Sequence, residues 1–211
     1  MIYKKSLKQI IDVIVAFVGL VVSSPVFLLL IICIKLDSKG PVLFKQRRIG
    51  KGKKEFYILK FRTMRIDTPK DMPTHLLEDP DMYITKVGKF LRKTSLDELP
   101  QIINIIKGEM SIIGPRPALW NQYDLIKERD KYGANDVTPG LTGWAQINGR
   151  DELPIDVKAK LDGEYVDKLS PLFDFKVFFM TIKSVLKSEG VKEGKNNSSE
   201  QNSETRKEAS S

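Results

Sequence analysis

The longest apolar run of the chain extends from Val13 to Ile34, and only a few small residues and Pro25 interrupt it. As a straight helix at ~1.5 Å per residue the run would reach about 33 Å, whereas the hydrocarbon core of a bilayer is about 30 Å thick. The run is too long for a cleaved signal peptide, and no small-residue cleavage site follows it. This pattern predicts a membrane-embedded helix near the N-terminus.

Two features of the run argue against a simple crossing. Ser24 and Pro25 fall near its middle, where a proline removes a backbone hydrogen bond and kinks the helix; the hydroxyls of Ser23 and Ser24 are expected to satisfy the freed carbonyl groups. Lys and Arg flank the run on both sides, which favours a cytoplasmic position for both ends. These residues alone leave two alternatives open, a re-entrant helix broken at Ser24-Pro25 or a kinked spanning helix. Asp12 is expected at headgroup level, paired with Lys8 one turn earlier.

The rest of the pattern predicts a small mixed domain. Apolar stretches on either side of Gly50-Lys51-Gly52 predict a β-hairpin with a glycine turn. Apolar periodicity predicts helices, and clusters of polar residues, prolines and glycines predict loops. The expected helices cover residues 99–107, 119–129, 154–168 and 172–187, and the expected loops cover residues 66–82 and 138–150.

The most amphipathic of these segments is Leu172–Lys187, with Leu and Phe on one face and Lys on the other. Core packing is the default explanation of the apolar face, and a helix lying flat at a membrane interface is the alternative. From Glu189 onward small and polar residues dominate, so a disordered tail is expected.

The charge of the chain points to an anionic partner. Among its 211 residues, 35 Lys and Arg face 27 Asp and Glu, which gives a net charge of +8; nucleic acid, an anionic membrane and a phosphorylated substrate all fit such an excess. The hairpin is especially basic and is expected to face lipid headgroups, or to bind substrate phosphates through Lys60 and Arg62. The single Cys excludes an internal disulfide and a Cys-based metal site, and the single His argues against a His-centred triad or a multi-His zinc site.

The candidate chemistry centres on the adjacent carboxylates Asp97 and Glu98. With either Ser95 or Asp97 as the N-cap, both acids would occupy the first turn of the helix that follows. Carboxylates at this position often serve only as caps. The cations Arg92 and Arg116 favour a catalytic role instead, because they are expected to keep Asp97 ionised as a nucleophile or metal ligand.

A second candidate element is Arg116, which lies between Pro115 and Pro117. The two prolines fix φ on both sides, so the backbone that carries Arg116 is expected to be stiff. A stiff guanidinium matches phosphate oxygens bidentately. A divalent cation, usually Mg²⁺, would shield the phosphate charge, and Asp97 and Glu98 are the expected metal ligands.

Five short sequence strings extend this picture. They are Gly40–Gln46, Lys60–Met64, Thr94–Gln101, Gly114–Pro117 and Gly140–Arg150. With these strings the chain resembles the bacterial sugar transferases, more narrowly the small monotopic phosphoglycosyl transferases that start glycan assembly on undecaprenyl phosphate. Any one of the strings would be weak, but five in the family order are specific, and the resemblance spans roughly residues 5–190.

The resemblance implies a re-entrant helix broken at Ser24-Pro25 and catalysis by the Asp97-Glu98 dyad with Mg²⁺. In the family the Asp attacks the β-phosphate of a UDP-sugar, which releases UMP and leaves a phosphoglycosyl-enzyme. Undecaprenyl phosphate then attacks this intermediate, and Glu98 would assist proton transfer or metal binding. The expected substrate-binding residues are Lys60, Arg62, Arg92, Pro115, Arg116, Pro117 and Arg150.

The expected fold is α+β, in a monotopic protein at the cytoplasmic face of the bacterial inner membrane, in contact with phospholipid. Residues 1–38 would form the re-entrant helix-break-helix. Residues 39–188 would form a catalytic domain that is mainly helical, with a small hairpin and interfacial amphipathic helices, and residues 189–211 the polar tail. The transferred sugar, the glycan served and the oligomeric state stay open.

Three positions depart from the family pattern. Thr138 replaces a frequent Arg, Gln9 follows Lys8 where a Lys-Arg pair is common, and Asp162 lies in a segment that matches only in part. Two other functions are also compatible with the residues. A membrane-tethered nucleic-acid-binding protein would predict salt-dependent binding, but the chain lacks the common nucleic-acid-binding motifs and no nucleic acid partner is expected. In a non-catalytic membrane adaptor, Asp97→Asn would be silent because Asn caps a helix equally well.

Overall fold

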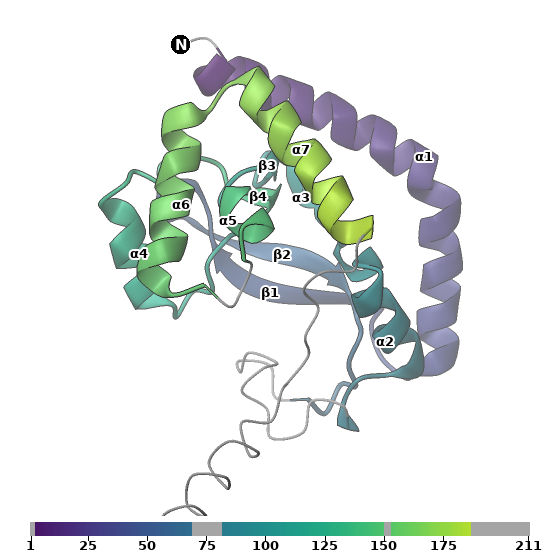
Figure 1. Ribbon diagram of the computed structural model, residues 1–211. Coiled ribbons are helices and arrows are strands. Elements are labelled where there is room, and N and C mark those ends of the chain that lie inside the picture. Colours follow the sequence, from purple (N-terminus) through teal and green to yellow (C-terminus); the bar gives the residue numbers. More distant parts are fainter. Residues whose placement is uncertain (1–2, 69–81, 150–152, 187–211) are drawn as a thin grey trace, which may run out of the picture.

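The computed structural model describes residues 3–68, 82–149 and 153–186 (Figure 1). Most of the loop predicted over residues 66–82, the whole polar tail from Glu189 and the candidate Arg150 lie outside these ranges.

The described chain is a mixed α and β structure with two small sheets, which confirms the α+β prediction at this level. The longest helix comes first, and short helices and strands follow it. In chain order the elements are the π-helical turn η1 (Tyr3–Leu7), α1 (Lys8–Asp37), β1 (Leu43–Ile49), the 3-10 turn η2 (Lys51–Lys53), β2 (Glu55–Phe61), α2 (Lys86–Lys93), the 3-10 turn η5 (Leu96–Glu98), α3 (Gln101–Ile106), β3 (Ser111–Ile113), α4 (Tyr123–Asp130), β4 (Gly140–Thr142), α5 (Trp144–Ile147), α6 (Ile155–Lys168) and α7 (Pro171–Leu186).

Helix α1 continues through Pro25 without a break. Its ribbon bends partway along its length (Figure 1). Pro25 has no N–H for the carbonyl of Val21, one turn earlier. The Ser24 hydroxyl donates to that carbonyl at 2.8 Å, and the Ser23 hydroxyl donates to Gly19 at 2.6 Å. The predicted role of the two serines is therefore confirmed. The predicted interruption of the helix is wrong, because these bonds satisfy the carbonyls without a break.

Both ends of α1 are attached to the remainder of the protein. Near the first end Asp12 accepts a hydrogen bond from Ser111 at 2.5 Å and pairs with Lys8 at 3.4 Å. At the other end Asp37 accepts a bond from the Val87 amide at 3.1 Å and so caps α2. The predicted Lys8 pair is confirmed. Asp12 is buried against β3 and so contacts the protein itself, while its level relative to the lipid headgroups stays a prediction.

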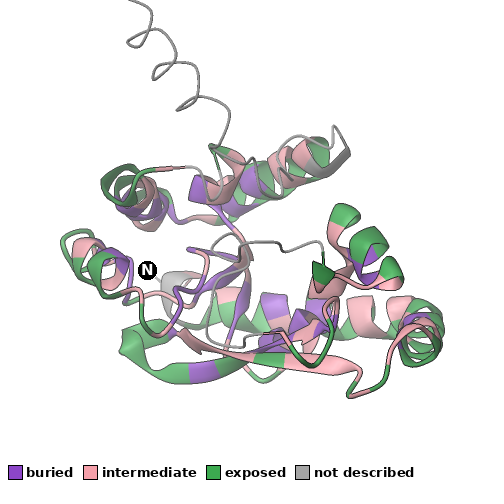
Figure 2. Ribbon diagram, turned by 90° about the horizontal axis from the view of Figure 1, so that it is seen from below, coloured by how far each residue is buried: buried purple, intermediate pink, exposed green. Residues whose placement is uncertain are grey.

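The middle of α1 exposes large apolar side chains, whereas buried residues concentrate toward the centre of the molecule (Figure 2). Of the described helices, α1 is long and apolar enough to cross a membrane, with a mean hydropathy of 2.8 in its most apolar window. Apolar surface of this extent is costly in water. It is consistent with the predicted membrane-embedded segment.

The predicted β-hairpin is confirmed as the antiparallel pair β1 and β2. On one face of β2, Phe56 and Ile58 pack with Ala16 of α1 and Ile105 of α3. Side chains two residues apart share a face of a strand. Lys60 therefore leaves β2 on the same face, at the end nearest the turn that follows α2.

The second sheet pairs β3 with β4 in parallel, and it depends on three glycines. A Cβ at Gly140 would lie 2.1 Å from the Gly114 nitrogen, and one at Gly143 would lie 2.1 Å from the Gly114 oxygen. Only residues without a side chain allow this approach. The predicted loop over residues 138–150 thus contains a short strand and the helix α5.

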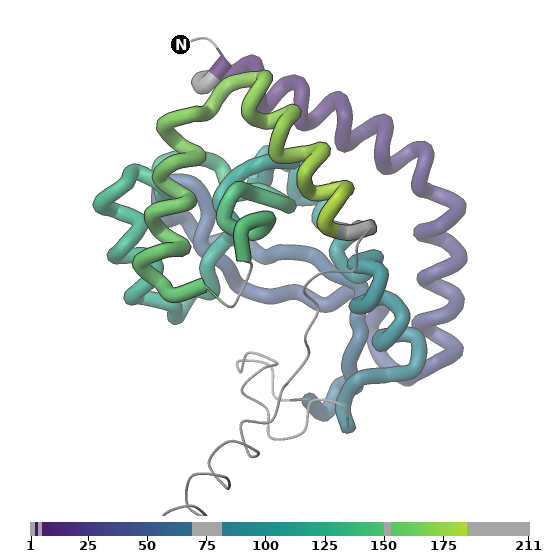
Figure 3. The backbone as a smooth tube through the Cα atoms, viewed as in Figure 1, coloured from purple at the N-terminus to yellow at the C-terminus, as the bar shows by residue number. Residues whose placement is uncertain are grey.

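Helix α7 lies beside the first part of α1, where Lys8 donates to Asp174, and α6 packs against α4 and α5 (Figure 3). The helices predicted at residues 154–168 and 172–187 are confirmed in position. Core packing as the explanation of the predicted apolar face is wrong, because its members Leu172, Phe175 and Phe179 are exposed, whereas Val177 is fully buried in a cluster with Tyr165. The alternative, a helix lying flat at a membrane interface, stays a prediction.

Candidate active site

The acidic pair Asp97-Glu98 lies in the 3-10 turn η5, between α2 and α3. Ser95, which precedes the turn, has a left-handed backbone with φ of 57° and makes no side-chain capping bond. Helix α3 begins only at Gln101, with Pro100 as its N-cap. Both predicted capping arrangements are therefore wrong. Ser95 turns the chain just before the two acids, which therefore lie in a separate 3-10 turn ahead of α3.

Glu98 is held by two cations that the sequence places far from it. The ammonium of Lys60 lies 2.7 Å, and the guanidinium of Arg116 2.8 Å, from the same oxygen, Oε1. Burial by itself raises the pKa of Glu98, but the attraction and hydrogen bonds of Arg116 and Lys60 outweigh it and hold that pKa well below its usual range. Glu98 is therefore ionised and organises both cations.

Asp97 has weaker ionic contacts than its neighbour. Its Oδ2 is 3.8 Å from Lys60, and its side chain is 14% exposed. Burial raises the pKa of Asp97 above its ordinary value of 3.8, against the opposing pull of Lys60, Arg92 and Arg116. The predicted cations do act on Asp97, since Lys60, Arg92 and Arg116 all lower its pKa, but burial acts more strongly in the opposite direction. That Asp97 is ionised stays a prediction. A carboxylate that is desolvated and weakly paired is a better nucleophile than one in a tight ion pair.

Arg116 is carried by a segment whose carbonyl groups are bound on several sides. The Gly140 amide donates to Pro115 at 2.9 Å, and the Ile49 amide donates to Ala118 at 2.9 Å. Arg48 donates from Nη1 to the Pro117 carbonyl at 3.0 Å. These bonds join β1 and β4 to the segment and support the prediction of a stiff backbone at Arg116.

Arg62, which was expected to bind a substrate phosphate, instead donates its hydrogen bonds to the end of α1 and the residues that follow it. It is buried, and its guanidinium donates to Lys39 at 2.6 Å, to Ser38 at 2.7 Å and to the carbonyl of Ile34 at 3.5 Å. These acceptors belong to the last turn of α1 and the chain that follows it. Since such carbonyls lack partners within a helix, Arg62 serves to fix the end of α1.

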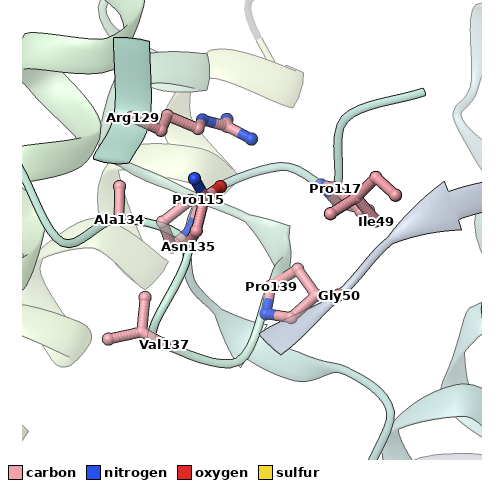
Figure 4. Close-up of a pocket in the computed structure, with 9 residues that line it drawn as sticks. All are labelled: Ile49, Gly50, Pro115, Pro117, Arg129, Ala134, Asn135, Val137 and Pro139. Atoms are coloured by element: carbon pink, nitrogen blue, oxygen red, sulfur yellow. The ribbon is translucent and has the colours of Figure 1, made fainter. Parts of the chain in front are cut away.

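The remaining candidates divide between the site and the scaffold. Arg92, in the last turn of α2, lowers the pKa of Asp97 and so belongs with the acidic pair. Asp162 lies in a buried ion pair with Arg129, at 2.6 Å, which joins α6 to α4. Arg129 also lines a small cavity with Pro115 and Pro117, away from the two acids (Figure 4).

The carboxylates fit a metal only if the substrate completes its coordination. Within residues 3–68, 82–149 and 153–186 no three His, Cys, Asp or Glu residues converge on a metal position. Mg²⁺ in proteins usually takes one or two carboxylates and completes its shell with waters and substrate phosphates. Asp97 and Glu98 supply that number of carboxylates, so they suit an ion that arrives with a diphosphate.

Comparison with known proteins agrees with this chemistry. Residues 3–188 match the family described as bacterial sugar transferases. The chain belongs to this family. Membership confirms the resemblance found in the sequence and makes the protein an enzyme of the transferase class.

Three relatives place this sugar transferase more closely. It is 41% identical over 187 residues to the uncharacterized sugar transferase EpsL of Bacillus subtilis (strain 168), and the match covers 89% of this chain and 91% of EpsL. It is 37% identical over 197 residues to the exopolysaccharide production protein ExoY of Rhizobium meliloti (strain 1021), with 87% of each chain covered. Over 184 residues it is 41% identical to the UDP-glucose:undecaprenyl-phosphate glucose-1-phosphate transferase of Escherichia coli (strain K12), and the match covers 83% of this chain but 39% of that relative.

One residue at the site has a role that the sequence did not reveal. Arg48 was grouped with the other basic residues of the hairpin, yet it reaches the segment that carries Arg116. The alternation of side chains along β1 could have indicated that Arg48 and Gln46 share a face of the strand and can contact each other.

Proposed function

We propose that the protein transfers a sugar-1-phosphate from a UDP-sugar to undecaprenyl phosphate, through a covalent intermediate on Asp97. The observation that carries the proposal is the position of a partly buried carboxylate, Asp97, beside the ion-paired group of Lys60, Glu98 and Arg116. The names of relatives such as the Escherichia coli glucose-1-phosphate transferase support the choice of donor and acceptor. Those of the exopolysaccharide proteins support a role in capsule, exopolysaccharide or glycoprotein glycan synthesis.

In the first half of the reaction an Asp97 oxygen attacks the β-phosphorus of the UDP-sugar. The bond from that phosphorus to the oxygen bridging the two phosphates breaks, and UMP leaves with this oxygen. Asp97 then carries the sugar phosphate as an acyl phosphate. In the second half a phosphate oxygen of undecaprenyl phosphate attacks the same phosphorus, which forms the polyprenyl diphosphate sugar and frees the Asp97 carboxylate.

Lys60 and Arg116 would bind the diphosphate oxygens whose negative charge must be balanced during both attacks. Glu98 holds these two cations side by side, because both contact its Oε1. The depressed pKa of Glu98 favours this role, together with metal binding, over donation of a proton. Asp97 and Glu98 would hold Mg²⁺ against the donor, and the ion would neutralise phosphate charge.

The attachment of α1 supports a monotopic arrangement at the cytoplasmic face. Asp12 near its start and Asp37 at its end both bond to the same domain. Between them α1 bends and exposes large apolar side chains (Figure 1). A helix with both ends on one domain suits entry and exit through one leaflet of phospholipid.

The proposal is tested by intact mass and peptide mapping of the full chain, in detergent or lipid, after incubation with each member of a UDP-sugar panel and Mg²⁺. One donor should give an adduct of one sugar phosphate on the peptide that contains Asp97, with release of one equivalent of UMP. Asp97→Ala should abolish both while membrane association persists. The exposed Asp67, paired with Arg65 at 2.8 Å, offers a control in Asp67→Ala, which should behave as wild type.

Two results would contradict the mechanism. The first is UMP release without an adduct at Asp97. The second is full turnover by Asp97→Asn, because Asn can cap a helix as well as Asp but does not supply the carboxylate that attacks phosphorus.

A further inference from the structure

The segment Pro115-Arg116-Pro117 can be positioned only through a limited set of backbone groups. Proline has no N–H, so two of its three residues cannot donate a backbone hydrogen bond. Its carbonyl groups are therefore the main points at which the fold can hold it. The Gly140 amide binds the first of these carbonyls, on Pro115, and Arg48 binds the last, on Pro117.

We infer that Arg48 is a positioning residue for Arg116, and that it aligns the Arg116 guanidinium with the donor diphosphate by holding the carbonyl of Pro117. The inference rests on the function proposed above, because it concerns the same diphosphate. Pro117 directly follows Arg116, so a shift of its carbonyl moves the Cα from which the Arg116 side chain extends.

The placement of Arg48 suits this task. It is partly buried on β1, in register with the buried Phe56 of β2. One guanidinium nitrogen, Nη1, donates to Pro117 at 3.0 Å, and the other, Nη2, donates to Gln46 Oε1 at 2.7 Å. Gln46 thereby fixes the plane of the guanidinium. A planar group held at both nitrogens defines the position of its acceptor more closely than a flexible ammonium would.

The neighbouring Arg47 provides an internal comparison. It points to the opposite face of the hairpin, where it lies 3.9 Å over the ring of Trp120 and 3.3 Å from Glu55. Arg47 has the same charge and the same strand as Arg48, but its contacts lie on the outer side of the sheet. One of them, Trp120, belongs to the segment that follows Arg116, so the exposed Lys45 on the same strand is the better control for loss of charge and for damage to the strand.

The geometric half of the inference is tested by amide hydrogen exchange of the full chain in detergent. Arg48→Met keeps the length of the side chain and removes its donors. It should speed exchange in peptides that cover residues 114–122 and 138–142, whereas Lys45→Met, at an exposed position of the same strand, should not. Unchanged exchange in Arg48→Met would overturn the inference.

The functional half is tested by a double-mutant cycle on UMP release. Arg48→Met should lower kcat/KM for the UDP-sugar by about tenfold to a hundredfold, the size expected from misplacing a binding group by ~1 Å. In an Arg116→Ala background the same change should cost less than about twofold, because the residue that Arg48 positions is gone. Arg48→Lys should retain more activity than Arg48→Met but less than wild type. Gln46→Met should lower kcat/KM less than Arg48→Met does, and its effect should likewise nearly vanish in the Arg116→Ala background.

The outcomes separate this inference from the proposed function. If Arg48→Met lowers kcat/KM by the same factor with and without Arg116, then Arg48 does not act through Arg116. That result would overturn the inference, even if hydrogen exchange is altered. If Arg48→Met does not fold, Gln46→Met and Arg48→Lys decide by the same criterion. A wild-type protein that releases no UMP from any UDP-sugar would contradict the proposed function, and with it the assignment of Arg48 to a diphosphate site.

Discussion

Arg116 and Glu98 form an ion pair at 2.8 Å although 18 residues separate them in the chain. The pair brings the segment after β3 to the turn before α3. Lys60 from β2 contacts the same glutamate oxygen at 2.7 Å. Three segments thus meet at one carboxylate, and Asp97 lies immediately beside it. The arrangement gives the two adjacent acids opposite electrostatic roles.

This contrast predicts opposite effects on stability at pH 7. Asp97→Asn should raise the free energy of unfolding, because burial disfavours the ionised Asp97. Glu98→Gln should lower it by about 1–3 kcal/mol, because two cations lose a charged hydrogen-bond partner. Denaturant unfolding in one detergent measures both changes. Destabilisation by Asp97→Asn would contradict the account of Asp97.

The sign can be checked by pH. The folded-state pKa of Asp97 is raised, so the cost of ionising it exists above that pKa and disappears as the pH falls through it. The gain from Asp97→Asn should therefore shrink as the pH approaches the ordinary aspartate value of 3.8. The stabilisation from Glu98 has the opposite sign. It is present above the unfolded-state pKa and is lost as the pH falls toward the depressed folded-state pKa.

The pH dependence of turnover should follow Asp97. Its attack requires the ionised form, so kcat/KM should fall as the pH drops through the raised pKa. Lys60 lowers that pKa, and Lys60→Met should therefore move the acid limb of the profile to higher pH. The exposed Lys45 on β1 gives a matched control in Lys45→Met, whose limb should stay in place. A limb that moves to lower pH in Lys60→Met would refute the assignment.

Arg62 should affect stability more than donor binding. Its hydrogen bonds all hold the end of α1 and the chain after it. Arg62→Met should lower the free energy of unfolding by about 1–3 kcal/mol, because buried carbonyl groups lose their donor. At a temperature where the variant remains folded, KM for the UDP-sugar should be unchanged. A large rise in KM would instead place Arg62 at the phosphates, as first predicted from the sequence.

Pro25 should control how α1 sits in the membrane. Pro25→Ala restores an N–H that can reach the Val21 carbonyl, so it should favour a straighter helix. We expect a protease-sensitive tag on the N-terminus to be accessible only from the cytoplasmic face in wild type. In Pro25→Ala a fraction should become accessible from the other face. Pro154→Ala, ahead of α6, is the control. A wild-type tag on the far face would contradict the monotopic arrangement.

The sequence allows prediction of elements that have local signals. The hairpin follows from its glycine turn, α7 from its periodicity, and the serine hydroxyls of α1 from the proline beside them. Strands β3 and β4 were not predicted, because three-residue strands carry no detectable periodicity. Their pairing depends on close contact between Gly114 and Gly140, which are distant in sequence.

The site was predicted in composition but not in geometry. Asp97, Glu98, Lys60 and Arg116 are all brought together as the strings suggested. The predicted capping arrangement of the two acids was wrong, because nothing in the local sequence reveals the left-handed conformation of Ser95. The roles of Arg62 and Arg48 depend on carbonyl groups that only the folded chain places within reach.

The two fastened ends of α1 have a consequence for how the enzyme responds to lipid composition. A spanning helix must match its length to the bilayer, and it tilts or strains when the thickness changes. In the proposed monotopic arrangement, a helix with both ends bound to one domain would contact the acyl chains of one leaflet only, so it would have no such length to match. We therefore expect vesicles of short-chain and long-chain phosphatidylglycerol to support equal turnover; a strong dependence on chain length would contradict the arrangement.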